Sequence, residues 1–387
     1  MIANSKNTFA PWHSCIAAVV LAATFAANTG AESLPEPPVA NVPVGAAEEA
    51  GPELALTVSL ELSTEPGNQT AVVGRLVHTQ WLIAGDQLEL TQRFSSLRKE
   101  FVTKYARPTS LFGFNMVSNE VRLADIQQFI TTEKTLRSSQ ASYRNLFGRQ
   151  TGFGLWGIGW GLEALRLDSQ PDLAPYLSDY IAREGRTSHI VPLLGYWALD
   201  RRIGDATLPI GHYDSAAVEW GGFFGNTRYA KADMSHESFW AITPRISAGF
   251  SFSIGYLRGI EGHLSPITKR YYGGGVGSVR GYEFGSLGPT DASGAAIGAD
   301  RKASGSAEIL WHGFDIGQTP VILSAFTDRG RFYGAENSTV TGVSAGASGV
   351  GISIPMSFGL ARFSFARPTD ETLRTQRFQF DARANWK

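Results

Sequence analysis

Two motifs in the sequence have the spacing of known catalytic or cofactor sites, but neither has the surroundings that its chemistry requires. Gly342-Val343-Ser344-Ala345-Gly346 spells a nucleophile elbow, a strand-to-helix turn whose serine works with a histidine further along the chain. The last histidine is His312, so no base follows Ser344. Gly152 to Gly157 fits a dinucleotide-binding pattern, yet the next residues alternate as in a strand. We therefore predict a protein that is not an enzyme and has no cofactor; hydrolysis through Ser344 stays an alternative.

The composition gives no indication of a metal or nucleic-acid site. The seven histidines are scattered, with no pair at metal-ligand spacing on a helix. The only cysteine, Cys15, lies in a segment that we expect to be removed, so a disulfide framework and a cysteine-ligated metal are both excluded from the mature chain. A formal net charge of -1 is no excess of base, which argues against a nucleic-acid partner.

One arginine and one aspartate, 48 positions apart in the sequence, are candidates for an ion pair. Arg280 lies in a glycine-rich segment, residues 258–300, which predicts a long loop, and such loops usually have a function. Asp328 ends an alternating segment in which it shares a face with Phe326. If the opposite, apolar face meets lipid, Asp328 points into a lumen. Arg280 is a suitable two-pronged partner there, and the pair would fold the loop back inside.

Strict alternation of apolar and polar residues predicts β-strands throughout the chain, because successive side chains of a strand point to opposite faces. The segments with this pattern are residues 54–62, 246–256, 302–311, 321–328 and 377–386.

A soluble β-sandwich would show the same alternation, but three observations favour a transmembrane β-barrel. An export signal is present without the cysteines common in secreted domains. The strands run about ten residues, the reach of a tilted strand across hydrocarbon. Tyr256, Trp311 and Trp386 lie at strand ends, where a barrel places its aromatic girdles. Since only a closed sheet satisfies its backbone hydrogen bonds in lipid, we predict an all-β, antiparallel transmembrane barrel with a long loop inserted in its lumen.

The chain divides into three parts. Residues 1–31 have one base, no acid and an apolar core, which is typical of a secretory signal peptide. Residues 32–53 contain five glutamates, five prolines and no base, and predict an extended linker. The barrel is expected over residues 54–387, and these 334 residues (387 less 53) make about sixteen strands at about 20 residues for a strand with its turn.

Two segments between residues 95 and 185 have apolar residues at helical spacing and predict short helical insertions. The first contains Leu123, Ile126, Phe129, Ile130 and Leu136, and the second contains Leu173, Tyr176, Leu177 and Tyr180.

The motifs around Arg280 and Asp328 resemble those of a known family. The family is the bacterial surface antigen superfamily, which contains BamA/TamA-type outer-membrane assembly factors and two-partner secretion transporters. Its VRGF or VRGY signature, in the sixth extracellular loop, resembles Val279-Arg280-Gly281-Tyr282. Its FxDxG signature, on a late strand, resembles Phe326-Thr327-Asp328-Arg329-Gly330. Supporting similarities occur in order at residues 189–192, 200–202, 208–211, 305–308, 349–351 and 360–363.

This resemblance implies a location, a site and a function. The location is the outer membrane, and the site is a loop lock that consists of Val279, Arg280, Gly281, Tyr282, Phe326, Asp328 and Gly330. In the family, the insertion or translocation of polypeptides is attributed to a seam between the first and last strands. In this sequence the corresponding seam residues are Leu56, Val58, Leu60, Phe378, Phe380 and Trp386. The implied partners are the lipid bilayer and client outer-membrane proteins. A passive pore or a structural surface antigen is the alternative.

The sequence also departs from the family pattern. Family members ordinarily carry periplasmic POTRA modules, which receive unfolded clients, before the barrel. Only the acidic linker of 22 residues stands in that place, so the resemblance implies either a separate POTRA-bearing partner or a barrel without insertase activity. The chain also ends Trp386-Lys387, whereas the family commonly finishes on the aromatic residue.

Overall fold

We describe the protein from a computed structural model. The described residues are 56–65, 69–129, 135–168, 174–203, 210–317, 319–334, 342–356 and 359–386. The predicted signal peptide (residues 1–31) and linker (residues 32–53) lie outside them, as do the predicted helical residues Ile130 and Leu173.

Antiparallel strands make up most of the described chain, as the alternating pattern predicts. Their bounds are β1 (Leu56–Glu65), β2 (Gln69–Thr79), β3 (Gln87–Phe94), β4 (Arg98–Pro108), β5 (Met116–Phe129), β6 (Thr135–Thr151), β7 (Gly154–Leu167), β8 (Thr187–Ile190), β9 (Leu193–Asp200), β10 (Gly211–Gly221), β11 (Tyr229–Thr243), β12 (Ile246–Gly259), β13 (Gly281–Tyr282), β14 (Arg301–Ile316), β15 (Thr319–Tyr333), β16 (Gly342–Met356), β17 (Gly359–Pro368), β18 (Thr375–Gln376) and β19 (Phe378–Trp386).

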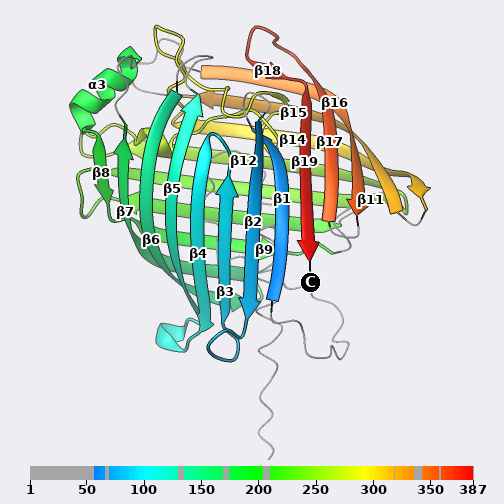
Figure 1. The fold of residues 1–387 in the computed structure, drawn as a ribbon, viewed down its shortest axis with the longest axis horizontal. Helices are drawn as coiled ribbons and strands as arrows, with labels where there is room; N and C mark the ends of the chain where they lie inside the picture. The colour runs from blue at the N-terminus through cyan, green and yellow to red at the C-terminus, as the bar shows by residue number, and fades with distance from the viewer. Residues whose placement is uncertain are drawn as a thin grey trace, which may run out of the picture.

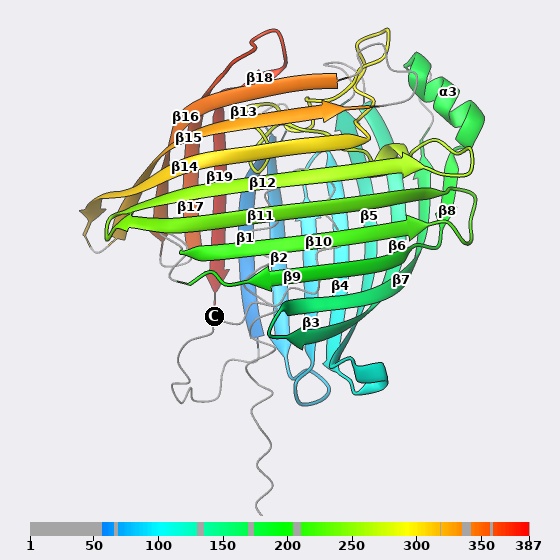
Figure 2. The same ribbon diagram turned by 180° about the vertical axis from the view of Figure 1, so that it is seen from behind.

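Seventeen of the described strands form one sheet, in which each strand pairs with its neighbours in chain order. β8 and β9 both pair with β7 at different heights and together act as one broken strand, which leaves sixteen positions around the sheet. The first strand pairs with the last, β1 with β19, from Val58 opposite Trp386 to Ser63 opposite Asp381. Figure 1 shows β1 beside β19, and Figure 2, seen from behind, shows β9 to β12, β14 and β15 crossing the side that faces the viewer. The fold is the predicted antiparallel barrel of about sixteen strands.

The two faces of the sheet differ in polarity. Large apolar side chains such as Ile158, Val218 and Ile309 are more than half exposed on the outer face. On the inner face, charged side chains such as Arg144 and Glu163 pair with one another. Because neighbouring residues of a strand point to opposite faces, the alternation in the sequence separates lipid-facing from lumen-facing residues.

Among the described helices, none combines the length and apolar character of a membrane-crossing helix.

The segment between β12 and β14, residues 260–300, folds inside the barrel at one of its two ends. We call this end the loop end and the opposite end the turn end. Many of its side chains are buried, including Tyr271, Leu287 and Ile297. Five glycines between residues 274 and 285 have φ between 72° and 99°, a region that other residues rarely adopt, which lets the segment turn repeatedly in a narrow space. We call this segment the lumen loop. It includes the 3-10 helix η3 (Ile267–Lys269); a second, η2 (Leu111–Gly113), lies at the turn end.

One of the two helical predictions is confirmed, and the other is wrong. Helix α3 (Pro175–Glu184) buries Tyr176, Leu177 and Tyr180 against the lumen loop, at the loop end of the barrel. Leu123, Ile126 and Phe129 belong instead to strand β5, and Leu136 belongs to β6. The helical spacing is incidental, because Leu123 is exposed on the outer face while its neighbour Ala124 is buried on the inner one.

Candidate functional site

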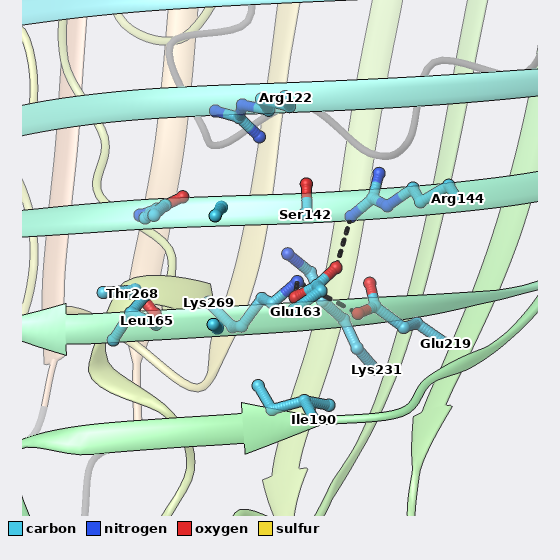
Figure 3. Close-up of a pocket in the computed structure, with 13 residues that line it drawn as sticks. Arg122, Ser142, Arg144, Glu163, Leu165, Ile190, Glu219, Lys231, Thr268 and Lys269 are labelled. Carbon is cyan, nitrogen blue, oxygen red and sulfur yellow. Dashed lines mark hydrogen bonds and ion pairs between the residues drawn. The ribbon is translucent and has the colours of Figure 1, made fainter.

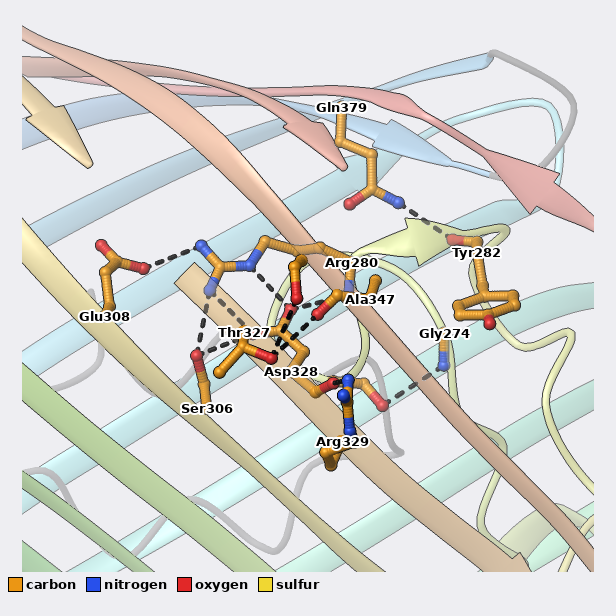
Figure 4. Close-up of polar contacts among 12 residues, drawn as sticks. Gly274, Arg280, Tyr282, Ser306, Glu308, Thr327, Asp328, Arg329, Ala347 and Gln379 are labelled. Carbon is orange, nitrogen blue, oxygen red and sulfur yellow. Dashed lines mark hydrogen bonds and ion pairs between the residues drawn. The ribbon is translucent and has the colours of Figure 1, made fainter. Parts of the chain in front are cut away.

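The centre of the candidate site is Arg280, which the lumen loop places against the inner wall formed by β14 and β15. Its Nε donates to Asp328 Oδ2 and its Nη2 donates to Asp328 Oδ1, both at 2.8 Å, which is the two-pronged geometry that a guanidinium and a carboxylate prefer. The backbone N–H of Arg280 also donates to Asp328 Oδ2, at 2.9 Å. Figure 4 shows both residues inside the barrel. The structure thus brings together the two charged residues that sequence analysis pairs.

Further donors and the flat face of the Arg280 guanidinium contact other residues of the wall. Nη1 donates to Glu308 Oε2 at 2.8 Å, and Nη2 donates to Ser306 Oγ at 3.0 Å. The guanidinium carbon lies 3.3 Å from the ring centroid of Phe326. Burial alone would lower the pKa of Arg280, but its hydrogen bonds and charge interactions with Asp328 and Glu308 outweigh burial and raise it. Asp328 is 1% exposed, so solvent screens this pair little.

The uncharged residues of the predicted loop lock provide the close packing around this ion pair. Val279 and Tyr282 are fully buried. A Cβ on Gly330 would lie 2.6 Å from Val279 Cγ2, so only glycine leaves room for the valine. Gly281 has φ of 90°, and a Cβ there would lie 3.1 Å from the Ala366 side chain. The signature residues therefore fix the close packing of the loop against the wall as well as the ion pair.

The lumen loop also contacts the segment that leads into the last strand. β13 of the loop pairs with β18, Gly281 opposite Gln376 and Tyr282 opposite Thr375. The side-chain amide of Gln379, in β19, donates to the carbonyl oxygen of Tyr282 at 2.9 Å, and Figure 4 shows this contact. The loop that holds Arg280 is therefore bonded directly to the last strand of the barrel.

A second tether holds the lumen loop to a different part of the wall. Lys269 Nζ lies 2.7 Å from Glu163 Oε2 of β7 and 3.0 Å from Glu219 Oε1 of β10. Glu163 also accepts from Arg144 Nη2 at 2.9 Å, and Tyr229 Oη donates to Glu219. Figure 3 shows Lys269 between the two carboxylates, beside a small cavity.

The sequence patterns did not predict this tether. The signals in the sequence were two glutamates, Glu163 and Glu219, each at an inward-facing position of a strand, and Lys269 in the glycine-rich loop.

The predicted seam residues lie where the first and last strands pair. On the outer face Leu56, Val58 and Phe378 are 43%, 41% and 55% exposed, and Leu60 and Phe380 are half-buried. The backbone of Trp386 pairs with Val58, whereas its side chain lies outside the described residues. The glycine-flanked Ser344 lies within β16 and not at a strand-to-helix turn.

Comparison with known proteins assigns this fold to a family. The Omp85 superfamily domain matches residues 84–383, and the chain belongs to this superfamily of outer-membrane β-barrels. The outer membrane assembly factor BamA of Neisseria meningitidis is 33% identical over 186 residues, which cover 38% of this chain and 23% of that protein. The aligned part thus spans less than a quarter of that relative's length.

Solved structures of outer-membrane proteins share the fold. The structure of BamA from Haemophilus ducreyi lacking POTRA domains 1–3 has a TM-score of 0.73 and 14% identity, over 86% of this chain and 70% of that one. CdiB from Escherichia coli has a TM-score of 0.59 and 14% identity, over 87% of this chain and 64% of that one. The matching family model confirms the predicted family, and these structural similarities confirm the barrel architecture.

Removal of the guanidinium should destabilise the loop-inserted barrel. Arg280→Ala leaves the buried Asp328 carboxylate without its cation, and loss of one partner of a buried pair costs about 3 to 5 kcal/mol. Arg280→Glu should be worse, because Glu308 would repel the new carboxylate. Asp328→Arg added to Arg280→Glu should recover part of the loss. The measurement is urea-dependent loss of heat-modifiable migration, with exposed Arg258→Ala as control. Equal midpoints for wild type and Arg280→Ala would contradict the assigned importance of the pair.

At the second tether, the two glutamates should differ in their contributions. Glu163 serves two cations, Arg144 and Lys269, whereas Glu219 has Lys269 and a tyrosine hydroxyl. Glu163→Gln should therefore lower the free energy of unfolding more than Glu219→Gln, by about 1 kcal/mol or more. Unfolding of each variant in denaturant measures the order, and the reverse order would show that Lys269 does not depend on Glu163.

Proposed function

We propose that the barrel assists the insertion or translocation of other polypeptides at the outer membrane, without making or breaking covalent bonds in its client. The support is its membership of the Omp85 superfamily together with one structural observation. The lumen loop is held by Arg280 at β15 and is also bonded to the last strand, through Gln379 and the carbonyl oxygen of Tyr282. A change in the loop can therefore reach the strand at which the barrel would open.

The pairing between the first and last strands is short, which supports an opening at that place. β1 and β19 pair over six residues, from Val58–Trp386 to Ser63–Asp381, whereas β1 and β2 pair over ten. A shorter ladder has fewer hydrogen bonds to break, so it opens at a lower cost than its neighbour. A strand of a client could then pair with the exposed edge of β1 by strand addition.

The proposed partners follow from this mechanism. Client outer-membrane proteins would meet the edge of β1 from the turn end, where the described chain begins and ends. A separate periplasmic protein with POTRA modules would supply the receiving surface for unfolded clients. Co-purification with the barrel from membranes identifies both kinds of partner.

A passive pore is the second candidate, and conductance distinguishes it from a plugged assembly barrel. The lumen loop fills the loop end of the barrel, so the wild-type protein should conduct weakly in planar bilayers. Arg280→Ala should increase the conductance or the frequency of opening, since the loop loses its strongest attachment to the wall. Steady, high conductance that is the same in both proteins would favour the pore and contradict the proposed plug.

A covalent seam should abolish the proposed activity while leaving the barrel folded. Leu60 and Ala384 are Cα partners across β1 and β19, so Leu60→Cys with Ala384→Cys should form a disulfide. Its matched control is Leu60→Cys with Gly74→Cys, which joins β1 to β2. In cells depleted of the wild-type chain, the levels of other outer-membrane proteins should recover with the control and fail to recover with the seam disulfide. Recovery with both would argue against lateral opening.

A further inference from the structure

A polar cluster lies on the outer wall of the barrel, away from the lumen loop. Asp214 and His212 come from β10, and His236 and Ser238 come from β11. The register places Asp214 opposite His236 and His212 opposite Ser238. These residues share the outer face with Val218 and Met234, which lie an even number of positions away and are 56% and 40% exposed.

Three members of the cluster form a continuous relay from carboxylate to imidazole to hydroxyl. His236 Nδ1 lies 2.7 Å from Asp214 Oδ1, and His236 Nε2 lies 3.0 Å from Ser238 Oγ. With a proton on Nδ1 donated to the carboxylate, Nε2 is free to accept the proton of the serine hydroxyl. A nucleophile, a base and a group that orients the base, each within hydrogen-bond reach of the next, are the recurring arrangement of serine hydrolases on unrelated folds.

The position of this relay is unusual for a barrel. Along β11 and β12 it is bounded by Met234 and Ile254 on one side and by Trp240 and Phe250 on the other, all at least 40% exposed. Charged groups on the lipid face destabilise a barrel in proportion to their depth, and ionisable residues among lipid-facing positions are therefore candidates for function. The inner face of the same two strands offers a contrast, because there the hydroxyl of Ser215 bonds to the hydroxyl of Ser235, at 2.6 Å, and to no imidazole.

We propose that Asp214, His236 and Ser238 form a lipid-facing acyl-ester hydrolase site whose substrate class is the glycerophospholipid. His236 Nε2 takes the proton of Ser238 as Oγ attacks the ester carbonyl. The C–O bond to the glycerol oxygen then breaks, and His236 gives its proton to that oxygen, so the lysophospholipid leaves and the acyl group stays on Ser238. Water, deprotonated by His236, attacks the acyl-serine, and the fatty acid leaves as the serine oxygen regains the proton.

The surroundings of the relay supply the other requirements of this chemistry. His212 is the cross-strand partner of Ser238, so its ring N–H is a candidate donor to the oxyanion that forms beside Ser238. β10 begins only three residues before Asp214, at Gly211, which places the aqueous rim about 10 Å away. Ser238 is 5% exposed, and Phe250 is its cross-strand partner on β12, so neighbouring side chains must move before an ester reaches Oγ.

The test uses the full-length protein purified from membranes and reconstituted in vesicles of phosphatidylethanolamine and phosphatidylglycerol. Wild type should release fatty acid and lysophospholipid, and a fluorophosphonate probe should label Ser238, as read by mass spectrometry. Ser238→Ala and His236→Gln should lower release by at least about a hundredfold, because the nucleophile and its base act as a unit. Ser235→Ala, on the same strand and the opposite face, should keep full activity and labelling.

A further variant separates a catalytic role from a merely structural one. Phe250→Ala should increase labelling and release severalfold, since it removes the large side chain directly across from Ser238. A relay that only satisfies its own hydrogen bonds would gain nothing. Heat-modifiable migration checks that each variant is folded. Wild-type release no greater than that of Ser238→Ala, or the absence of probe on Ser238 in both wild type and Phe250→Ala, would overturn the proposal.

Discussion

Every backbone N–H and C=O group that meets hydrocarbon must find its partner within the protein, and the architecture of this chain follows from that constraint. The pairing of β1 with β19 lets the strands satisfy one another around the barrel. Alternation then sends apolar side chains outward and charged ones inward. The inner wall thus carries carboxylates, such as Glu163, Glu219 and Asp328, whose burial is costly unless cations reach them. The lumen loop supplies two of those cations, Lys269 and Arg280.

The two cations bind to different parts of the wall, with β11 and β12 between them in the sheet. Lys269 reaches β7 and β10, whereas Arg280 reaches β14 and β15. Between these attachments the loop turns at glycines with positive φ, and close packing beside Arg280 leaves no room for a larger side chain at Gly281 or at Gly330 of β15. The loop is therefore an internal brace, and the signature around Arg280 is one of its two ends.

The sequence predicts well those features that depend on the order of residues within one strand or one loop. Alternation of apolar and polar residues identifies β1, β12, β14, β15 and β19. An arginine in the loop and an aspartate on the inward face of a strand suggest the Arg280–Asp328 contact. Patterns fail where periodicities overlap, as at Leu123, whose spacing fits a helix although it lies in β5. They also fail where residues meet only through register. Lys269 and Glu163 are about a hundred positions apart, and Asp214 meets His236 because two strands pair, so a search for histidines at helical spacing passes over them.

The brace bears on whether one ladder of a closed barrel can open without loss of the fold. Breaking β1 from β19 removes the closure but leaves the other ladders intact. Because the lumen loop ties β7 and β10 to β14 and β15 through buried ion pairs, the proposed opening of the seam would leave these cross-links in place. A barrel without such a brace would have to rely on its ladders alone to resist flattening. Weak pairing at one place and a strong internal tether elsewhere are thus two parts of one arrangement, and the contact between Gln379 and the carbonyl oxygen of Tyr282 connects them.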